Sequence, residues 1–312
     1  MIGFILAAGF GTRLKPLTEN VPKALISVCG IPLLERNLSF FKRQDVDKIG
    51  VNVHYLPEQM YSFRESSSVH FDIFHEKDEI RGTGGALYFA RDFLASDDLF
   101  CIANADIISN VDIQKAAGTF LESDCICALV AAPAAGNGTI LYDPDSNEYR
   151  GPHSKGRKYQ NAAGADFIGM AFYKKKVLDL VKKDDFSVLP VWERIQDHGF
   201  SVTVLMQHDI FWRDTGTPSA LAKIHFDVLD GTVTLNIPDT VTIDYKKKIA
   251  YPSALSSKSV STLGKYTWAD SDKIAETATI KRCVVYSGAV VRERESFSGM
   301  IITPWGGIPI DT

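Results

Sequence analysis

The chain has 312 residues, of which 45% are hydrophobic and 23% are charged, and its net charge is −4. These ordinary globular values exclude a disordered or fibrous chain and allow one large domain or two unequal ones. A protein that neutralises many nucleic-acid phosphates is usually basic, so the charge argues against DNA or RNA as a partner. No apolar run reaches the roughly 18 residues of a membrane-spanning helix, so no membrane partner is expected.

The cysteines and the first residues bear on the cellular compartment. The five cysteines are scattered and never spaced as Cys-x-x-Cys, which argues against a disulfide framework or a zinc site. Residues 1–8 carry no basic segment and run directly into glycines, so they are predicted to form a buried strand rather than a signal peptide. We therefore expect a cytoplasmic protein.

Short apolar runs alternate with amphipathic stretches over the first ~230 residues. Strands are predicted at residues 3–8, 48–53, 72–74, 99–103, 125–130, 167–173 and 201–206. Helices are predicted at residues 32–41, 57–65, 84–93, 111–121, 175–182, 188–197 and 218–229. Strands followed by helices indicate an α/β fold with a Rossmann-like, mostly parallel sheet. Such sheets bind ligands beyond the carboxyl ends of their strands, so the residues that follow each strand are candidates.

The pattern changes near residue 230, where the helical periodicity ends. Apolar residues then recur at intervals of five or six, with small and polar residues between them, at Ile274, Ile280, Val285, Val291 and Phe297. An apolar period of about six predicts a small left-handed β-helix with one short strand per repeat, and a few irregular strands are the alternative. We therefore expect an α/β domain at residues 1–230 and a β domain with hexapeptide-like repeats at residues 231–312.

A glycine-rich loop directly follows the first predicted strand. Gly9 and Gly11 let the backbone approach a ligand and turn N–H groups toward an anion. The Walker A and dinucleotide patterns are absent, since no Gly-Lys-Ser/Thr follows and Leu14 occupies the third fingerprint position. Arg13 can hold phosphate oxygens bidentately, and Lys23 supplies a second cation. The loop predicts a phosphate-binding site, and a tight turn with two exposed cations is the alternative.

The residues around this loop resemble a known family. Residues 6–18 read Leu-Ala-Ala-Gly-Phe-Gly-Thr-Arg-Leu-Lys-Pro-Leu-Thr, and Pro-Lys at 22–23 and Val-Cys-Gly-Ile-Pro-Leu at 28–33 follow. The pattern is similar to that of nucleotidyltransferases that make NDP-sugars from sugar 1-phosphates. The resemblance implies that Arg13 and Lys23 stabilise the pyrophosphate leaving group and the transferred phosphate. It assigns nucleotide binding to Leu6, Ala7, Ala8, Gly9, Gly11 and Thr12.

A second glycine cluster begins at residue 82. Small residues permit the close approach of a flat ring, and a helix N-terminus offers unpaired N–H donors. The family has a similar stretch that cradles the nucleobase, so the resemblance assigns Glu76, Gly82, Thr83 and Gly84 to nucleotide binding. A glycine-rich helix start without a ligand is the alternative. The Gly-Thr-Gly-Gly-Ala form is most similar to members that use GTP.

Two aspartates are candidate magnesium ligands. Residues 99–106 are an apolar strand that ends in Asn-Ala-Asp, so Asp106 lies just past the carboxyl end. Mg²⁺ takes oxygen ligands and typically keeps one or two carboxylates plus substrate phosphates. Residues 211–218 resemble the family's Trp-x-Asp-x-Gly-Thr-Pro, and the resemblance makes Asp106 and Asp214 ligands of one Mg²⁺. Taken alone, each would be a turn or helix-cap residue.

The acceptor side has a weaker pattern. Residues 167–170 resemble a strand that borders the family's sugar pocket, which assigns Gly169 to sugar binding, with Asn161 and Asp166 as further candidates. Many relatives carry Glu-Lys-Pro before this strand, with the lysine on the sugar phosphate, and this chain has none. The substitutes left open come from the turn-rich residues 137–165 and are Arg150, Lys155, Arg157 and Lys158.

The resemblance covers about residues 2–230 and implies an enzyme that uses Mg²⁺ to transfer a nucleotide from an NTP to a sugar 1-phosphate. GTP with mannose 1-phosphate or a related sugar phosphate is the first expectation. The alternatives are UTP with glucose 1-phosphate or an amino-sugar 1-phosphate, and a regulatory homologue that binds nucleotide without turnover. A β-helix mediates assembly in part of the family, so a homo-oligomer is expected. Acyl transfer by the repeats is disfavoured, because it needs a catalytic histidine and the last of the seven histidines is His225.

Overall fold

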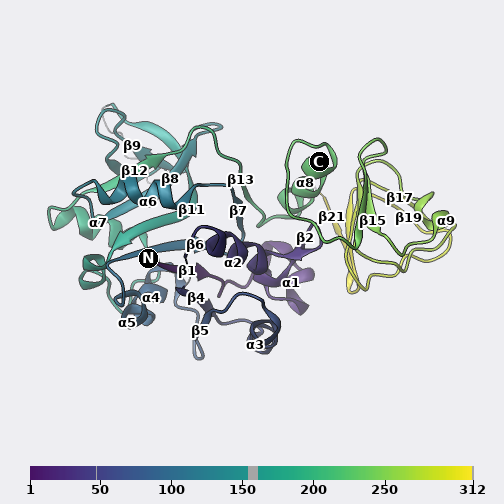
Figure 1. The fold of residues 1–312 in the computed structure, drawn as a ribbon, viewed down its shortest axis with the longest axis horizontal. Coiled ribbons are helices and arrows are strands. Elements are labelled where there is room, and N and C mark those ends of the chain that lie inside the picture. The colour runs from purple at the N-terminus through teal and green to yellow at the C-terminus, as the bar shows by residue number, and fades with distance from the viewer. Residues whose placement is uncertain (47, 154–160, 311–312) are drawn as a thin grey trace. The chain divides into compact units, whose positions relative to one another are not determined.

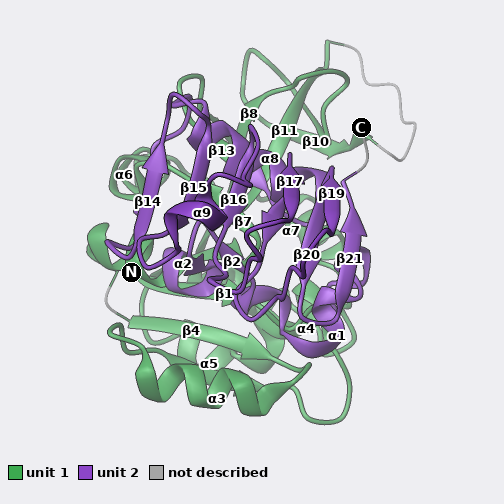
Figure 2. Ribbon diagram, turned by 90° about the vertical axis from the view of Figure 1, so that its right-hand side faces the viewer, with its two compact units in different colours: residues 1–9, 37–212 green, residues 10–36, 213–312 purple. Residues whose placement is uncertain are grey.

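The computed structural model describes residues 1–46, 48–153 and 161–310, and it divides into two compact units (Figure 2). The first unit holds residues 1–9 and 37–212, and the second holds residues 10–36 and 213–312. The segment that follows the first strand therefore groups with the C-terminal part of the chain. Each unit combines segments that are distant in the sequence. The expected domain boundary at residue 230 therefore stays a prediction.

A nine-stranded sheet forms the centre of the first unit among the described residues. Its main path runs β10-β9-β11-β6-β1-β4-β5, and β8 pairs with β11 and β12 (Figure 1). The strands are β1 (Ile2–Leu6), β4 (Lys48–Val53), β5 (Asp72–His75), β6 (Leu99–Asn104), β8 (Cys127–Pro133), β9 (Ile140–Tyr142), β10 (Tyr149–Pro152), β11 (Ala163–Lys174) and β12 (Val202–Met206). Strands β6, β1, β4 and β5 are parallel, as are β8 and β12, which confirms the expected α/β fold with a parallel centre. Strand β11 runs antiparallel to β6, β8 and β9, which the apolar pattern did not indicate.

The carboxyl ends of three central strands lie level with one another. Leu6 of β1 stands opposite Asn52 of β4 and opposite Asn104 of β6. Apolar side chains occupy both faces of these strands, as in parallel sheets that are covered on both sides. The two asparagines interrupt the apolar runs at the row where the chain leaves the sheet, which is the edge at which such sheets bind ligands.

Helices and short elements connect the strands of the first unit. They are α2 (Leu33–Arg43, which begins in the second unit), α3 (Pro57–Ser66), α4 (Gly82–Phe89), α5 (Arg91–Leu94), β7 (Ile107–Ser109), α6 (Ile113–Leu121) and α7 (Leu189–Asp197). The helix predicted at 84–93 is divided into α4 and α5, because the chain leaves the helical region at Ala90 (φ −94°, ψ 11°). The helix predicted at 175–182 is a shorter 3₁₀ helix, Lys175–Asp179.

The second unit joins two distant parts of the chain. Its elements are α1 (Leu17–Asn20), β2 (Ser27–Val28), β3 (Ile31–Pro32), β13 (Trp212–Asp214, which begins in the first unit), α8 (Pro218–Leu229), β14 (Val241–Asp244), β15 (Ile249–Pro252), α9 (Ser257–Val260), β16 (Thr267–Ala269), β17 (Thr279–Lys281), β18 (Val284–Val285), β19 (Ser296–Ser298), β20 (Met300–Thr303) and β21 (Gly306–Pro309). Helix α8 begins where expected, because the Thr217 hydroxyl accepts from the N–H of Ala220 and Pro218 occupies the first turn. In the described part of the chain, no helix is both long and apolar enough to cross a bilayer.

Short parallel strands stack in the C-terminal part of the second unit. Strands β15, β16, β18 and β20 pair in parallel in that order, and β17 pairs in parallel with β19. The recurring apolar residues meet across this stack, since Ile274 bridges to Val291 and Ile280 pairs with Phe297. They share one core with Val285. The stack explains the six-residue period, and the left-handed coil itself stays a prediction.

Candidate functional site

The chain leaves β1 at Leu6 and enters the glycine-rich loop. The N–H of Ala7 donates to Oδ1 of Asn52 over 2.7 Å, so this amide is already engaged. Ala8 is buried, whereas Gly9 is exposed and a Cβ there would meet nothing within 4 Å. The start of the loop is therefore held by β4, and the backbone at Gly9 is open to solvent.

The second glycine of the loop has a conformation that only glycine adopts easily. Gly11 has a φ of +63°, and a Cβ there would lie 2.8 Å from Cγ2 of Thr18. The Thr18 hydroxyl donates to the main-chain oxygen of Gly11 over 2.9 Å. A 3₁₀ helix, Thr12–Leu14, follows at once and leaves Arg13 exposed.

Arg13, Lys23 and Asp214 converge on Gly216 in the second unit. A Cβ on Gly216 would lie 2.6 Å from Nη2 of Arg13, 2.8 Å from Oδ1 of Asp214 and 2.9 Å from Nζ of Lys23. The N–H of Gly216 donates to Oδ1 of Asp214 over 2.6 Å. Two cations and one carboxylate thus surround a position that has no side chain. Such an arrangement suits the binding of an anion such as a phosphate.

Asp106 and Asp214 have the chemistry of magnesium ligands. Asp106 is partly buried in the turn between β6 and β7, and Asp214 is exposed. Over residues 1–46, 48–153 and 161–310, no group of three or more His, Cys, Asp or Glu side chains is arranged to hold a metal ion. A Mg²⁺ site completed by substrate phosphates needs only one or two carboxylates, and carboxylate oxygens suit this hard cation. The donor chemistry of each aspartate therefore fits the expected role.

Glu76 is fully buried beside the end of β4. Its Oε1 accepts from Nδ2 of Asn52 over 2.8 Å, and its Oε2 accepts from the N–H of Arg81 over 2.7 Å. A buried carboxylate is stable only when it has such donors. The structure thus shows Glu76 joining β4 to the turn before α4, and its nucleotide-binding role stays a prediction.

The glycines at the start of α4 allow a close approach of another part of the backbone. Gly82 has a φ of +68°, and a Cβ there would lie 2.0 Å from the carbonyl oxygen of Phe186. A Cβ on Gly84 would lie 2.6 Å from the carbonyl oxygen of Asp185. These contacts explain why glycine is needed at both positions without any ligand.

Residues 185–188 are themselves firmly anchored. Both oxygens of Asp185 accept from the guanidinium of Arg194, over 2.8 and 2.9 Å, and this hydrogen bonding lowers the pKa of Asp185. The Thr83 hydroxyl accepts from the N–H of Val188 over 2.9 Å. The start of α4 therefore rests on a rigid neighbour that the sequence reading did not single out.

On the acceptor side, one glycine contacts the end of β6. Gly169 has a φ of +76°, and a Cβ there would lie 2.8 Å from Nδ2 of Asn104. Asp166 lies on the same strand and accepts from the N–H of Ala135 over 3.3 Å. Asn161 is exposed, with a φ of 57°. Gly169 thus borders the strand end that leads to Asp106, and its role in sugar binding stays a prediction.

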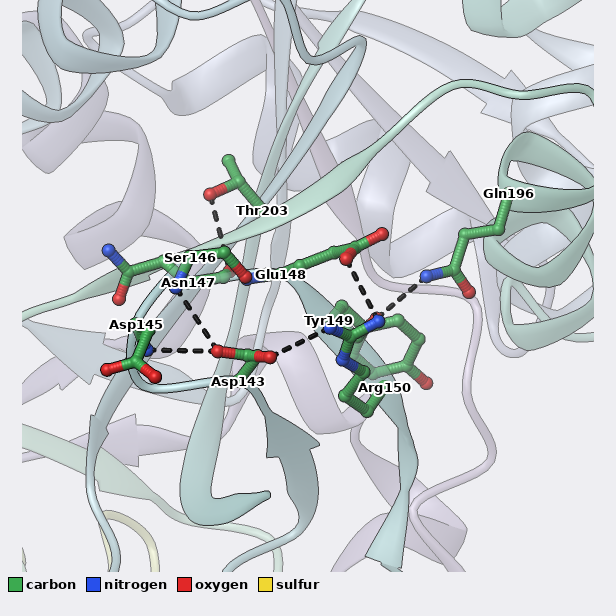
Figure 3. Close-up of polar contacts among 9 residues, drawn as sticks. All are labelled: Asp143, Asp145, Ser146, Asn147, Glu148, Tyr149, Arg150, Gln196 and Thr203. Carbon is green, nitrogen blue, oxygen red and sulfur yellow. Dashed lines mark hydrogen bonds and ion pairs between the residues drawn. The ribbon is translucent and has the colours of Figure 1, made fainter. Parts of the chain in front are cut away.

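Arg150 is engaged within the turn that joins β9 and β10 (Figure 3). Its Nη2 lies 2.8 Å from Oδ2 of Asp143, and its Nη1 lies 3.0 Å from Oε2 of Glu148. The hydrogen bond from Arg150 lowers the pKa of Asp143. Arg150 therefore closes this turn in the structure. The other three candidates for the sugar phosphate, Lys155, Arg157 and Lys158, lie outside the described residues.

Comparison with known proteins identifies the family. The model of the Nucleotidyl transferase family matches residues 2–231. The chain belongs to the nucleotidyl transferase family. It is 30% identical to the bifunctional protein GlmU of Methanocaldococcus jannaschii over 264 residues, which are 80% of this chain and 57% of that protein. It is 27% identical to a mannose-1-phosphate guanyltransferase of Debaryomyces hansenii over 252 residues, which are 75% of this chain and 64% of that protein.

Among solved structures, HddC from Yersinia pseudotuberculosis has a similar fold. The TM-score is 0.60 at 22% sequence identity, over 72% of this chain and 97% of that one. The chain spans less than two thirds of the length of the two curated relatives above. The comparisons thus establish the family and the fold of this chain. They do not by themselves establish the activity of the whole protein.

Two residues of this nucleotidyl transferase chain were missed by the sequence reading. Asn52 holds both Ala7 and Glu76, and a polar residue near the end of the apolar run Ile-Gly-Val-Asn-Val was the available signal. Gly216 lies within the Trp-Arg-Asp-Thr-Gly-Thr-Pro motif. Nothing in this motif indicates that the side chains of Arg13 and Lys23 lie beside Gly216.

Proposed function

We propose that this protein transfers a nucleoside monophosphate group from an NTP to a sugar 1-phosphate and releases pyrophosphate. The observation that carries the proposal is the convergence of Arg13, Lys23 and Asp214 on Gly216. Membership of the nucleotidyl transferase family supports the reaction class. The Debaryomyces relative, whose name gives mannose 1-phosphate and a guanylyl group, supports GTP with mannose 1-phosphate as the first substrate pair.

The proposed reaction needs no covalent enzyme intermediate. An oxygen of the sugar 1-phosphate attacks the α-phosphorus of the NTP, and the bond from that phosphorus to the bridging oxygen of the β-phosphate breaks. Pyrophosphate leaves with the electron pair. The phosphate monoester is already an anionic nucleophile, so no side chain has to remove a proton. Arg13 and Lys23 would oppose the negative charge that develops on the leaving group, and catalysis would rest on positioning and electrostatics.

We assign Mg²⁺ as the metal, with Asp106 and Asp214 as its protein ligands. When bound, the ion would neutralise phosphate charge and orient the phosphates. The carboxylate chemistry of both residues supports this assignment. Leu6, Ala7, Ala8, Gly9, Gly11, Thr12, Gly82, Thr83 and Gly84 would contact the nucleotide, and Gly169, Asn161 and Asp166 the sugar.

Three further features belong to the same proposal. The parallel stack of β15, β16, β18 and β20 supports a left-handed β-helix. Such a β-helix offers a surface for a homo-oligomer. All five cysteines are unpaired, which supports a reducing, cytoplasmic compartment.

The test is pyrophosphorolysis, the reverse reaction. Purified protein is mixed with Mg²⁺, pyrophosphate and one NDP-sugar from a panel that varies both base and sugar, and the NTP formed is measured. GDP-mannose should give GTP. A positive result with UDP-glucose or a UDP-amino sugar would change the substrates but keep the reaction class. Nucleotide binding without turnover on the whole panel, in both reaction directions, would contradict the proposal and indicate a regulatory homologue.

A further inference from the structure

Within the first unit, one asparagine connects the residue that follows β1 to the turn before α4. Oδ1 of Asn52 accepts from the N–H of Ala7, and Nδ2 of Asn52 donates to Oε1 of Glu76. The other oxygen of Glu76 accepts from the N–H of Arg81, the residue before Gly82. Two side chains therefore form a continuous path of hydrogen bonds from the loop after β1 to the turn before α4.

An amide suits this position because it has a donor and an acceptor at one end. The N–H of Ala7 requires an acceptor, and the carboxylate of Glu76 requires a donor. Asn52 is 3% exposed and Glu76 is 0% exposed, so water does not replace either partner. Aspartate would lack the donor, and an apolar side chain would leave both partners unsatisfied.

We propose that Asn52 is a positioning residue that sets the distance between the two nucleotide-binding segments, and that Glu76 acts through it rather than by reading the base. This inference rests on the proposed function, because it treats both segments as nucleotide-binding. It differs from the sequence expectation for Glu76, whose carboxylate is fully buried and engaged by Asn52 and Arg81. The prediction is that Asn52 and Glu76 control the affinity for every NTP equally.

The first variant is Asn52→Asp, which preserves shape but replaces the donor Nδ2 by an oxygen facing Glu76. The KM for NTP should rise about tenfold, the loss expected when a buried hydrogen bond to a charged group is broken. The kcat should change much less, since the hydrogen bonds of both side chains go to Ala7, to Arg81 and to each other. A proton shared by the two carboxyl groups would restore a donor, so the KM defect should shrink as pH falls. The pH profile of the KM of the wild type is the reference for this comparison.

The second variant reverses the donor and acceptor between the two residues. In Asn52→Asp with Glu76→Gln, the new carboxylate accepts from the Ala7 N–H and from the new amide, whose oxygen accepts from the Arg81 N–H. All the hydrogen bonds are restored, so the KM should return to within about threefold of wild type. Failure of this rescue, with the fold intact by thermal melting, would overturn the proposal.

The base-reading alternative makes a different prediction for Glu76→Gln. A positioning role raises the KM for GTP and for UTP by the same factor, whereas a base contact changes their ratio. A changed ratio would overturn the proposal. The control for the charge added in Asn52→Asp is Asn147→Asp, which introduces a carboxylate at an exposed turn residue and should leave KM and kcat unchanged.

A failure of the proposed function can be distinguished from a failure of this inference. If the proposed function is wrong, the wild-type protein shows no turnover with any NDP-sugar of the panel. The inference is then judged from the dissociation constant of a fluorescent GTP analogue, which should rise in Asn52→Asp and recover in the double variant. Equal affinity in all three proteins would overturn it.

Discussion

The hydroxyl of Tyr286 donates a 2.9 Å hydrogen bond to the main-chain oxygen of Ser27, 259 residues earlier in the chain. Ser27 begins β2, shortly after the 3₁₀ helix Lys23–Leu25. A second contact supports the first, because Nε2 of His225 accepts from the N–H of Cys29 over 3.0 Å. The segment that carries Lys23 is therefore held by α8 and by the C-terminal strands within one unit.

Replacing Tyr286 by phenylalanine should lower the free energy of unfolding by about 1 kcal/mol, because one buried hydrogen bond is lost and the ring is retained. Urea unfolding measures the change. The control is Tyr245→Phe, because Tyr245 is 57% exposed and its hydroxyl should contribute little. Equal stability of the two variants would contradict the prediction.

Gly216→Ala should abolish most turnover while leaving the fold stable. The new methyl group would displace the ends of Arg13, Lys23 and Asp214, which are flexible and therefore move at little cost to stability. Pyrophosphate release and thermal melting measure the two effects. Gly118→Ala is the matched control, because a Cβ there meets nothing within 4 Å. A variant at Gly216 that keeps its turnover would contradict the proposed phosphate site.

Arg13→Ala should reduce kcat by about 10²–10³-fold, the usual cost of removing one group that stabilises charge in the transition state. Steady-state pyrophosphate release measures it. Arg64→Ala removes an exposed arginine from α3 and should leave kcat unchanged. Equal rates in the two variants would remove Arg13 from the catalytic residues.

Two buried groups in the second unit should make stability depend on pH in opposite directions. Burial lowers the pKa of His225 to about 4, so the unfolded chain takes up this proton first and stability falls as pH drops from about 6.5 to 4. Burial raises the pKa of Asp270 to about 6, so the folded chain takes up that proton first and stability rises as pH drops from about 6 to 4. The two effects should largely cancel in the wild type.

Asp270→Asn removes the gain in stability that protonation of Asp270 provides as pH falls, and leaves the loss that comes from His225. Its unfolding free energy should therefore fall more steeply than that of the wild type between pH 6 and 4, by an amount on the order of 3 kcal/mol over the interval. Urea unfolding at several pH values measures the slope. Parallel curves for the two proteins would show that Asp270 keeps an ordinary pKa in the folded state.

Much of the α/β part could be predicted from the sequence. The strands at β1, β4, β6 and β12 match the predicted apolar runs closely, because buried parallel strands consist of such runs. The predictions were less accurate where tertiary contacts intervene. Helix α4 ends early, at Phe89, and β11 extends over Ala163–Lys174 because it pairs with three neighbours.

The local features of this protein follow from its sequence alone. It located the glycines whose positive φ the loops require, such as Gly11 and Gly82, and the cations and carboxylates of the candidate site. Which of these groups meet depends on the folding of distant segments. Arg13, Lys23 and Asp214 converge because residues 10–36 pack with residues from 213 onward. The spacing of residues along the chain does not predict such contacts, because they depend on how distant segments pack.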